Sequence, residues 1–417
     1  MTAMISKLLT LSSHARHILT DNHEWIRNNK QETKADTYHR VWRTGGLAKL
    51  HRSLTRHFVT DAVNSLTEKG YDFEQHTAGA VTSTLYRLDQ IHDICEHIGI
   101  PSLQDLNPGK KATVAYILNL KGGVGKSVVL STLAHGLVLH DPLITLRLRV
   151  LVVDLDPQSS ASLFLHHESS IGDDVNTAAL AIAEERTQEV LLDDFVQKTS
   201  IPNVDIIPAS IADGFMANVL ERIAREQGVS PTTLLLNRVI KPLEDLYDII
   251  LIDTGPHLDT FMLNAFRAAT NLLIPLAPTS VDMDSSLRFL MRLPEITALA
   301  YDLKSPEELP NLTDMRLRNY AGFMSKYVKN SESAKNYQRL ARQLFGPDFL
   351  KYDLPDLVPF RKCGDSYDTV FSVSPTTYEG DSSGSLKGAI AAAQDFTSCV
   401  FDEIAVAQQW KLERHRG

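Results

Sequence analysis

Lys121-Gly122-Gly123-Val124-Gly125-Lys126-Ser127 is the strongest structural signal in this chain. It is a phosphate-binding loop, because glycines let the backbone turn its N–H groups towards phosphate oxygens without obstruction by a Cβ. Lys126 supplies a point charge for the β- and γ-phosphates, and the Ser127 hydroxyl is a ligand for Mg²⁺. The general pattern G-x-x-x-x-G-K-[ST] would place glycine at position 120, where this chain has Leu120. That pattern leaves Lys121 without a role.

The residues on either side place this loop between a strand and a helix. Residues 113–120 are mostly apolar and predict a buried strand, and residues 127–138 have the apolar spacing of a helix. A bound anion would therefore lie at the positive end of a helix dipole. The sequence predicts a site for a nucleoside triphosphate.

Lysines at both ends of the loop make the chain resemble the deviant Walker A ATPases, the ParA/MinD family. Residues 149–158, RVLVVDLDPQ, resemble the family's second strand and its D-x-D-P-Q motif. Residues 247–256, YDIILIDTGP, resemble its Walker B strand, and the likeness continues through Ile274-Pro275 and residues 322–325. Within the family, the chain is similar to the large ParA proteins that segregate low-copy plasmids and plasmid prophages. Those proteins carry an additional N-terminal DNA-binding domain.

The resemblance implies a set of site residues. Lys121 would reach across a dimer interface to the partner's phosphates, in the manner of an arginine finger, and would form the catalytic set with Lys126 and Asp156. Asp156 is expected to orient the attacking water, since phosphoryl transfer needs a positioned nucleophile and neutralised oxygen charge. Capping of a helix that begins near Ser159 is the alternative role for Asp154 and Asp156. The expected Mg²⁺ ligands are Ser127, Asp154 and Asp253, and the expected nucleotide contacts are Gly122, Gly123, Val124, Gly125, Lys126, Ser127, Val128 and Met324.

A basic stretch precedes the ATPase motifs. Between Asp36 and Asp61 there is no acidic residue, while five lysines and arginines occur with histidines between them. Such a stretch suits contact with phosphates, and a solvated basic face is the alternative. The expected DNA contacts here are Arg43, Lys49, Arg52, Arg56, His57 and Thr60, the last two and Arg56 on the strength of the resemblance.

The pattern inside this stretch predicts a helix-turn-helix. Residues 44–50 predict a short helix and residues 56–69 a second one that ends at Gly70. The second helix of this motif enters the major groove. Residues 81–88 are expected to form the strand of a wing, since large ParA proteins have a winged helix-turn-helix at this place. The inward face of the second helix is predicted to comprise Phe58, Val59, Ala62, Val63 and Leu66.

Alternating strands and helices after residue 112 predict an α/β fold with a doubly wound, mostly parallel sheet. Segment 170–200 is acidic and helical, and we interpret it as a family-variable insertion outside the site. Strands are expected near residues 113–120, 149–154, 204–208, 247–253, 271–276 and 318–324. The predicted domains are an N-terminal helix at 1–36, the winged helix-turn-helix at 37–106, a linker at 107–112 and the ATPase domain at 113–417.

The N-terminal helix has a seam of mostly apolar residues at alternating spacings of three and four, from Leu8 to Trp25. Dimerisation through this seam and packing onto the chain's own domain are both open, and the resemblance favours dimerisation. A second, non-specific DNA surface is expected at Arg361 and Lys362, with Lys326, Lys329 and Lys335 as further candidates. Smaller ParA proteins have a proline-arginine pair where this chain has Pro355-Asp356, which leaves these contacts open.

Composition bounds the function. The chain has 417 residues, enough for two or three domains, and only three widely spaced cysteines. A sparse, odd set of cysteines excludes the cluster of a nitrogenase iron protein and favours a reducing compartment. No signal peptide and no apolar run of 18 residues is apparent, so no membrane span is expected. The net charge of −9 conceals the basic stretch.

The resemblance implies a partition ATPase of the bacterial cytoplasm, associated with the nucleoid. Its cofactors would be ATP or ADP with Mg²⁺, and its partners a second copy, non-specific chromosomal DNA, its own operator and a ParB-type centromere-binding protein. Two other classes remain open. One is a nucleotide-sensing repressor without turnover; the other is a MinD-like membrane-associated ATPase, which would need a C-terminal amphipathic anchor. Residues 401–417 match such an anchor weakly, and a packed last helix is the alternative.

Overall fold

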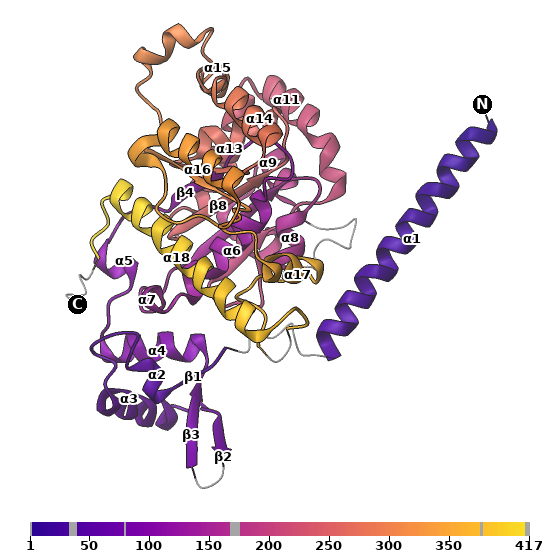
Figure 1. Ribbon diagram of the computed structural model, residues 1–417. Helices are drawn as coiled ribbons and strands as arrows, with labels where there is room; N and C mark the ends of the chain where they lie inside the picture. Colours follow the sequence, from indigo (N-terminus) through magenta and orange to yellow (C-terminus); the bar gives the residue numbers. More distant parts are fainter. Residues whose placement is uncertain (1, 33–39, 79–80, 167–175, 376–377, 413–417) are drawn as a thin grey trace.

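The structure, a computed structural model, describes residues 2–32, 40–78, 81–166, 176–375 and 378–412 (Figure 1). A long N-terminal helix, α1 (Thr2–Glu32), is followed by a small domain of helices and a β-hairpin and then by a large α/β domain. The predicted seam of α1 faces solvent, with Leu11 and Trp25 each 65% exposed. Within the described residues, this seam of α1 is therefore not packed against either domain of the chain.

The small domain has the elements of a winged helix-turn-helix. Thr55 caps the start of helix α3, because its side-chain oxygen accepts a hydrogen bond from the Phe58 N–H at 3.4 Å. Gly70, just after the end of the helix, has a φ of 92°. The sheet has the order β1-β3-β2 with antiparallel pairs, and β2 and β3 form the hairpin of the predicted wing. The elements are β1 (Trp42–Arg43), α2 (Thr44–Leu47), α3 (Arg56–Glu68), β2 (Gln75–Ala78), β3 (Val81–Tyr86), α4 (Leu88–Ile98) and α5 (Leu103–Leu106).

The prediction was wrong for one core residue of this domain, Phe58. Val59, Ala62 and Leu66 are buried, but Phe58 is 50% exposed. The buried residues follow the i, i+3, i+7 spacing of one helix face, and Phe58 lies one position off that face. Phe58 was predicted to be buried because it is apolar, although the helix period directs its side chain towards solvent.

The large domain is built on a seven-stranded sheet with the order β10-β9-β4-β8-β5-β7-β6. All of its pairs are parallel except the one between β6 and β7. The six predicted strands are present, with ends shifted by a few residues, and the short edge strand β6 was not predicted. The strands are β4 (Thr113–Ile117), β5 (Val150–Leu155), β6 (Gln197–Lys198), β7 (Val204–Ile207), β8 (Ile249–Thr254), β9 (Asn271–Leu276) and β10 (Asn319–Met324).

Helices cover both faces of this sheet (Figure 1). Alternate residues of β4 enter two separate apolar clusters, Ala115 and Ile117 on one face and Val114 and Tyr116 on the other. Helices α6 and α18 pack in the first cluster, and α9, α11 and α13 pack in the second. The sheet is therefore doubly wound. The α-helices are α6 (Lys126–Leu139), α7 (Asp141–Ile144), α8 (Ser160–Leu165), α9 (Ala178–Ala183), α10 (Gln188–Val190), α11 (Met216–Gln227), α12 (Lys241–Leu243), α13 (Thr260–Ala268), α14 (Ser280–Leu290), α15 (Leu293–Ala300), α16 (Glu332–Phe345), α17 (Val358–Asp365) and α18 (Ser383–Gln408).

The expected insertion and the C-terminal segment both pack into this domain. Residues 176–200 of the expected insertion contribute Ile182, Leu191 and Phe195 to the second cluster, whereas residues 167–175 lie outside the described part. At the C-terminus, Ile404 is buried and Trp410 packs against the first cluster. Among the described residues, no helix is long and apolar enough to cross a bilayer.

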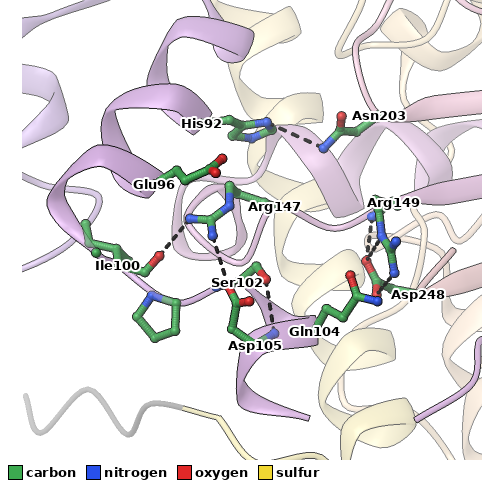
Figure 2. Close-up of a pocket in the computed structure, with 12 residues that line it drawn as sticks. His92, Glu96, Ile100, Ser102, Gln104, Asp105, Arg147, Arg149, Asn203 and Asp248 are labelled. Carbon is green, nitrogen blue, oxygen red and sulfur yellow. Dashed lines mark hydrogen bonds and ion pairs between the residues drawn. The ribbon is translucent and has the colours of Figure 1, made fainter. Parts of the chain in front are cut away.

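Polar contacts join the small domain to the large one. The Arg147 guanidinium donates to the Ile100 carbonyl at 2.7 Å and to Asp105 at 3.1 Å (Figure 2). Nearby, the Leu103 N–H donates to the Leu146 carbonyl at 2.9 Å. Arg40 donates to the Leu139 carbonyl and to Asp141, at the C-terminal end of α6.

A polar cleft of about 630 Å³ lies at this junction (Figure 2). The side chains of His92 and Asn203 meet across it, with 3.4 Å between Nδ1 and Nδ2. Burial lowers the pKa of His92 to about 4, and the Arg147 charge adds to this shift. His92 is therefore neutral at pH 7. On the large-domain side, Arg149 makes a bidentate ion pair with Asp248.

Candidate nucleotide site and nucleic-acid interface

The phosphate-binding loop joins β4 to α6. Gly123 and Gly125 have φ values of 80° and 85°, in the left-handed region that glycine adopts without strain. Val124 is buried, while Gly122 and Gly123 are exposed, so the loop presents its backbone to solvent. The predicted contacts from Gly122 to Val128 therefore lie around the N-terminus of α6, where an anion is favoured, with Val124 and Lys126 buried and the other five residues accessible to solvent.

Lys126 and Asp253 lie together beneath this loop. Lys126 is buried, and burial lowers the pKa of its ammonium, although the charges of Asp253 and Asp156 oppose this. Asp253 ends up fully buried near the end of β8, and burial raises its pKa to about 6. Interactions with the Ser127 hydroxyl and the Lys126 ammonium hold that increase in check.

The residues present fit a magnesium ion at this place. Asp253 Oδ2 is buried and has no hydrogen-bond donor among the described residues, although Oδ1 accepts from the Thr254 N–H at 3.1 Å. Such an orphaned carboxylate oxygen next to the Ser127 hydroxyl is a favourable oxygen ligand for a hard cation. The described residues contain no cluster of three or more His, Cys, Asp or Glu side chains suited to a metal. The remaining ligands would have to be phosphates and water, as is usual for Mg²⁺.

Asp154 and Asp156 follow one another at the end of β5 but have different surroundings. Asp154 is fully buried, and its carboxylate accepts from the Ser162 N–H at 2.9 Å, the Ser162 hydroxyl at 2.7 Å and the Asp156 N–H at 3.0 Å. Burial and the nearby Asp253 charge raise its pKa well above the ordinary value. Both oxygens of the Asp154 carboxylate therefore accept hydrogen bonds from protein donors, and these bonds fix the conformation of the turn after β5.

Asp156 is the least buried of the three carboxylates, at 9% exposed. Its Oδ1 accepts from the Gln158 N–H at 3.0 Å. A Cβ at Gly255, directly after β8, would lie 3.4 Å from the same oxygen. The turn after β8 thus passes close to Asp156, and the Asp156 charge acts on Asp253.

The far side of the loop is held by residues after β10. The Ser325 hydroxyl donates to the Val124 carbonyl at 2.7 Å, and the Lys326 ammonium donates to the Gly123 carbonyl at 2.7 Å. Met324 is fully buried, and its backbone is bonded to Asp353 and Leu354. The structure therefore places Met324 behind the loop and its two successors against the loop.

Lys121 lies at the start of the loop beside α14. Its ammonium is 3.4 Å from Asp282, and its backbone N–H donates to the Asn119 side chain at 2.8 Å. Reasoning from the sequence missed Asn119 and Asp282, and only the position of Asn119, two residues before the loop, offered a signal. It included Ser325 in the family likeness and named Lys326 as a candidate for DNA contact, but it did not predict that both side chains donate to carbonyls of the loop.

The expected DNA contacts of the small domain are all on its surface. Arg43 lies on β1, Lys49 and Arg52 follow α2, and Arg56 begins α3; the four side chains are exposed and have no ion-pair partner in the part of the chain that the structure describes. His57 and Thr60 also lie on α3. His57 is 3.3 Å from Asp61, and the Thr60 hydroxyl donates to the Arg56 carbonyl at 2.8 Å.

The late basic candidates are partly neutralised. On α17, Arg361 is 3.6 Å from Asp356, and Lys362 is 3.4 Å from Asp365. The side chains of Arg361 and Lys362 are nevertheless both more than half exposed. The four cations of the small domain, which are exposed and have no ion-pair partner among the described residues, are therefore the better candidates for contact with phosphates.

Comparison with known proteins identifies the family. The family description "AAA domain" matches residues 112–301, and "ParA helix turn helix domain" matches residues 15–107. Plasmid partition protein A of Escherichia coli is 40% identical over 401 residues, which cover 96% of this chain and 98% of that protein. The chain belongs to the ParA family of plasmid partition ATPases.

Solved structures agree with the ParA assignment. A partition protein superposes with a TM-score of 0.71 and 32% identity, covering 91% of this chain and 96% of that one. A cobyrinic acid a,c-diamide synthase of Mycobacterium smegmatis, with bound ADP and magnesium, shares the fold at a TM-score of 0.50 and 16% identity; the match covers 73% and 99% of the two chains. The family and the two-part fold predicted from the sequence are thus confirmed.

Proposed function

We propose that this ParA-family protein is an ATP-driven switch with two DNA-binding activities. ATP or ADP would bind the loop from Gly122 to Val128, and ATP would bring two copies together. The ATP-bound dimer would coat chromosomal DNA without sequence preference. The other nucleotide states would use the small domain to repress the protein's own operon.

One observation supports this proposal above the others. A single chain combines a phosphate loop beside buried carboxylates with a helix-turn-helix whose four basic side chains Arg43, Lys49, Arg52 and Arg56 are exposed and unpaired among the described residues. A purely catalytic ATPase has no need of the second part, and a simple repressor has no need of the first.

The chemistry would be divided among few residues. Lys126 would bind the β- and γ-phosphates, and Asp156 would orient the attacking water. Ser127 and Asp253 would hold Mg²⁺, which neutralises phosphate charge when bound. Asp154 would keep the Asp156 turn in place through Ser162. Met324, which is fully buried, would support the loop from behind and would not contact the nucleotide.

Lys121 would act on the nucleotide of a second copy. Because such an interaction exists only in the dimer, we expect Lys121→Ala to retain nucleotide binding and to lose ATP-dependent dimerisation and hydrolysis. A partner of the ParB type, bound to a centromere, would stimulate hydrolysis that is slow in its absence. The solvent-facing seam of α1 offers a second contact between copies.

The deciding experiment measures binding to two labelled duplexes, an unrelated sequence and the region upstream of the gene, with ATP, ADP or no nucleotide. We expect ATP-dependent, salt-sensitive binding of the unrelated duplex and a preference for the upstream duplex with ADP. Binding of the upstream duplex alone in every nucleotide state would reduce the protein to a repressor. Binding of neither would favour the membrane-associated alternative, which liposomes would then test.

A further inference from the structure

Two residues that follow β10 bond to backbone carbonyls of the phosphate loop. The Ser325 hydroxyl donates to the Val124 carbonyl at 2.7 Å, and the Lys326 ammonium donates to the Gly123 carbonyl at 2.7 Å. Both carbonyls precede the first acceptor of helix α6, which is the Gly125 carbonyl, so the helix itself cannot satisfy them. Their partners therefore come from a part of the chain about 200 residues away.

These two bonds set the direction of two N–H groups of the loop. The described residues contain no cis peptide bond, and in a trans peptide the carbonyl and the following N–H point in opposite directions. Since the Gly123 and Val124 carbonyls bond to residues after β10, the N–H groups of Val124 and Gly125 point away from β10. In the sheet, β8 and β5 lie on the other side of β4, and their ends carry Asp253 and Asp156. The two N–H groups are thus directed to the side of the predicted nucleotide site.

Lys326 lies over the loop in an uncommon backbone conformation. Its φ is 52°, in the left-handed region that is unfavourable for a residue with a Cβ. A Cβ built on Gly125 would lie 3.7 Å from Lys326 Cε, so the stem of the lysine passes across the loop. Strained backbone of this kind persists where surrounding contacts maintain it, and the bond to the Gly123 carbonyl is such a contact.

We propose that Lys326 is a positioning residue for nucleotide binding, because its bond to the Gly123 carbonyl directs the Val124 N–H towards the phosphates. This inference rests on the proposed binding of ATP or ADP by the loop. A charged donor at a carbonyl also polarises the peptide group, which makes the N–H a stronger donor to phosphate oxygens. Ser325 acts in the same way, with a neutral hydroxyl, on the Gly125 N–H. Lys326 therefore serves the nucleotide site rather than the DNA surface.

The first test is the ADP affinity of Lys326→Met, which keeps an unbranched stem and removes the charged donor. In the full-length protein with Mg²⁺, we expect calorimetry to show ADP binding weakened about three- to tenfold, the usual effect of one hydrogen bond. Lys326→Arg retains a charged donor and should recover most of the affinity.

Lys351→Met is the matched control. Lys351 is exposed and follows Leu350, whose N–H donates to the Gly322 carbonyl of β10, so the substitution removes the same charge from the same edge of the sheet. Its ammonium lies 5.0 Å from the centroid of the Tyr352 ring rather than on the loop. We expect Lys351→Met to bind ADP as the wild type does.

A second measurement separates positioning of the loop from direct contact with the nucleotide. The sequence contains the pair Gly-Val twice, at 123–124 and 228–229. Glycine labelled with ¹³C at the carbonyl and valine labelled with ¹⁵N therefore give one NMR correlation for each of these two peptide bonds. In the nucleotide-free protein, Lys326→Met should shift the Val124 signal, because its peptide group loses the bond to the ammonium. The Val229 signal should stay in place and is the internal reference.

Unchanged ADP affinity in Lys326→Met would overturn the inference, including the case in which this variant loses DNA binding instead. Weaker ADP binding with an unmoved Val124 signal would also overturn it, because Lys326 would then contact the nucleotide itself. Equal weakening in Lys351→Met would attribute the effect to net charge and reject a role for the bond. A wild-type protein that binds no ADP would refute the proposed function itself.

Discussion

Three buried charges define the site at the scale of single residues. Lys126, Asp154 and Asp253 lie within one enclosed region, and burial disfavours the charged form of each. The lysine compensates the carboxylates only in part, since the pKa of Asp253 still rises to about 6. The nucleotide-free site therefore carries an electrostatic cost that a bound cation would relieve.

Mg²⁺-dependent nucleotide binding should weaken in mild acid. In the proposed site the ionised Asp253 carboxylate holds Mg²⁺, and a pKa of about 6 means that this group becomes protonated as the pH falls through 6. We expect the gain in ADP affinity on adding Mg²⁺ to shrink roughly tenfold between pH 7.5 and pH 5. Calorimetric titration with and without Mg²⁺ measures it. Asp253→Asn is the reference for the protonation of ADP itself, and an identical pH profile in that variant would contradict the assignment.

The same shift has a consequence for stability. The folded chain holds the Asp253 proton more tightly than the unfolded chain, whose carboxyl has the ordinary pKa of 3.8. This group therefore lowers the free energy of unfolding as the pH rises from about 4 to 6. We expect Asp253→Asn to stabilise the nucleotide-free protein at pH 7.5 by about 1–3 kcal/mol, as measured by urea unfolding. Unchanged or lower stability would show that the carboxylate is compensated by its neighbours.

Helix α6 is the element on which the site depends. It begins at Lys126, and its interior is buried on nearly every side, with α18 packed closely against it. The closest approach is at Gly136. A Cβ built there would overlap Thr397 Oγ1 and lie 3.1 Å from Phe371 Cε2, so glycine is required by space in the middle of a helix.

Gly136→Ala should therefore destabilise the protein, although alanine favours helices. We expect the severe overlap to cost about 3 kcal/mol, at the upper end of the usual range for overpacking, which exceeds the roughly 1 kcal/mol that alanine gains in helix propensity. Thermal unfolding of Gly136→Ala and of Gly136→Ala/Thr397→Ala measures this, because the second substitution removes the overlapping hydroxyl. A double variant no more stable than Gly136→Ala would show that the contact with Thr397 is not the cause.

The elements of this fold could be predicted from sequence where their pattern was local. Apolar runs predicted β4, β5 and β8, and the glycine loop predicted the start of α6. The helix period indicates that Phe58 lies outside the core, but the prediction counted it as a core residue because it is apolar. The two-residue strand β6 has too little sequence to form a pattern. The partners of Lys121 and of the loop carbonyls were out of reach, because Asp282, Ser325 and Lys326 are brought there by strands β9 and β10.

At the scale of the whole molecule, the small and the large domain share one buried apolar cluster, and polar contacts lie beside it at their junction. Arg147 has a φ of 49°, in the left-handed region that is unfavourable for a residue with a Cβ. Its guanidinium bonds to Ile100 and Asp105 of the small-domain side, and Arg40 bonds to the end of α6 from the other direction. Directional contacts of this kind set an orientation between domains.

Arg147→Ala should loosen that orientation without affecting the nucleotide site. The loss of two hydrogen bonds to a charged group should cost about 1–3 kcal/mol. We expect faster hydrogen exchange in residues 99–106, measured by mass spectrometry, and unchanged ADP affinity. Arg186→Ala is the control, since Arg186 pairs with its near neighbour Glu184 on the large domain. Equal exchange in the two variants would show that the junction does not depend on Arg147.

The α6–β5 connection joins the two ends of the molecule. Helix α6 runs from Lys126 to Leu139, whose carbonyl accepts from Arg40, and β5 returns to Asp154 and the turn at Asp156. Fourteen helical residues span about 21 Å and turn by about 100° each. The number of residues in α6 therefore fixes the angle about the helix axis between the phosphate loop at its start and the contact of Arg40 with the Leu139 carbonyl at its end. One inserted residue would rotate one relative to the other by more than a quarter turn, even if every side chain at either end were kept.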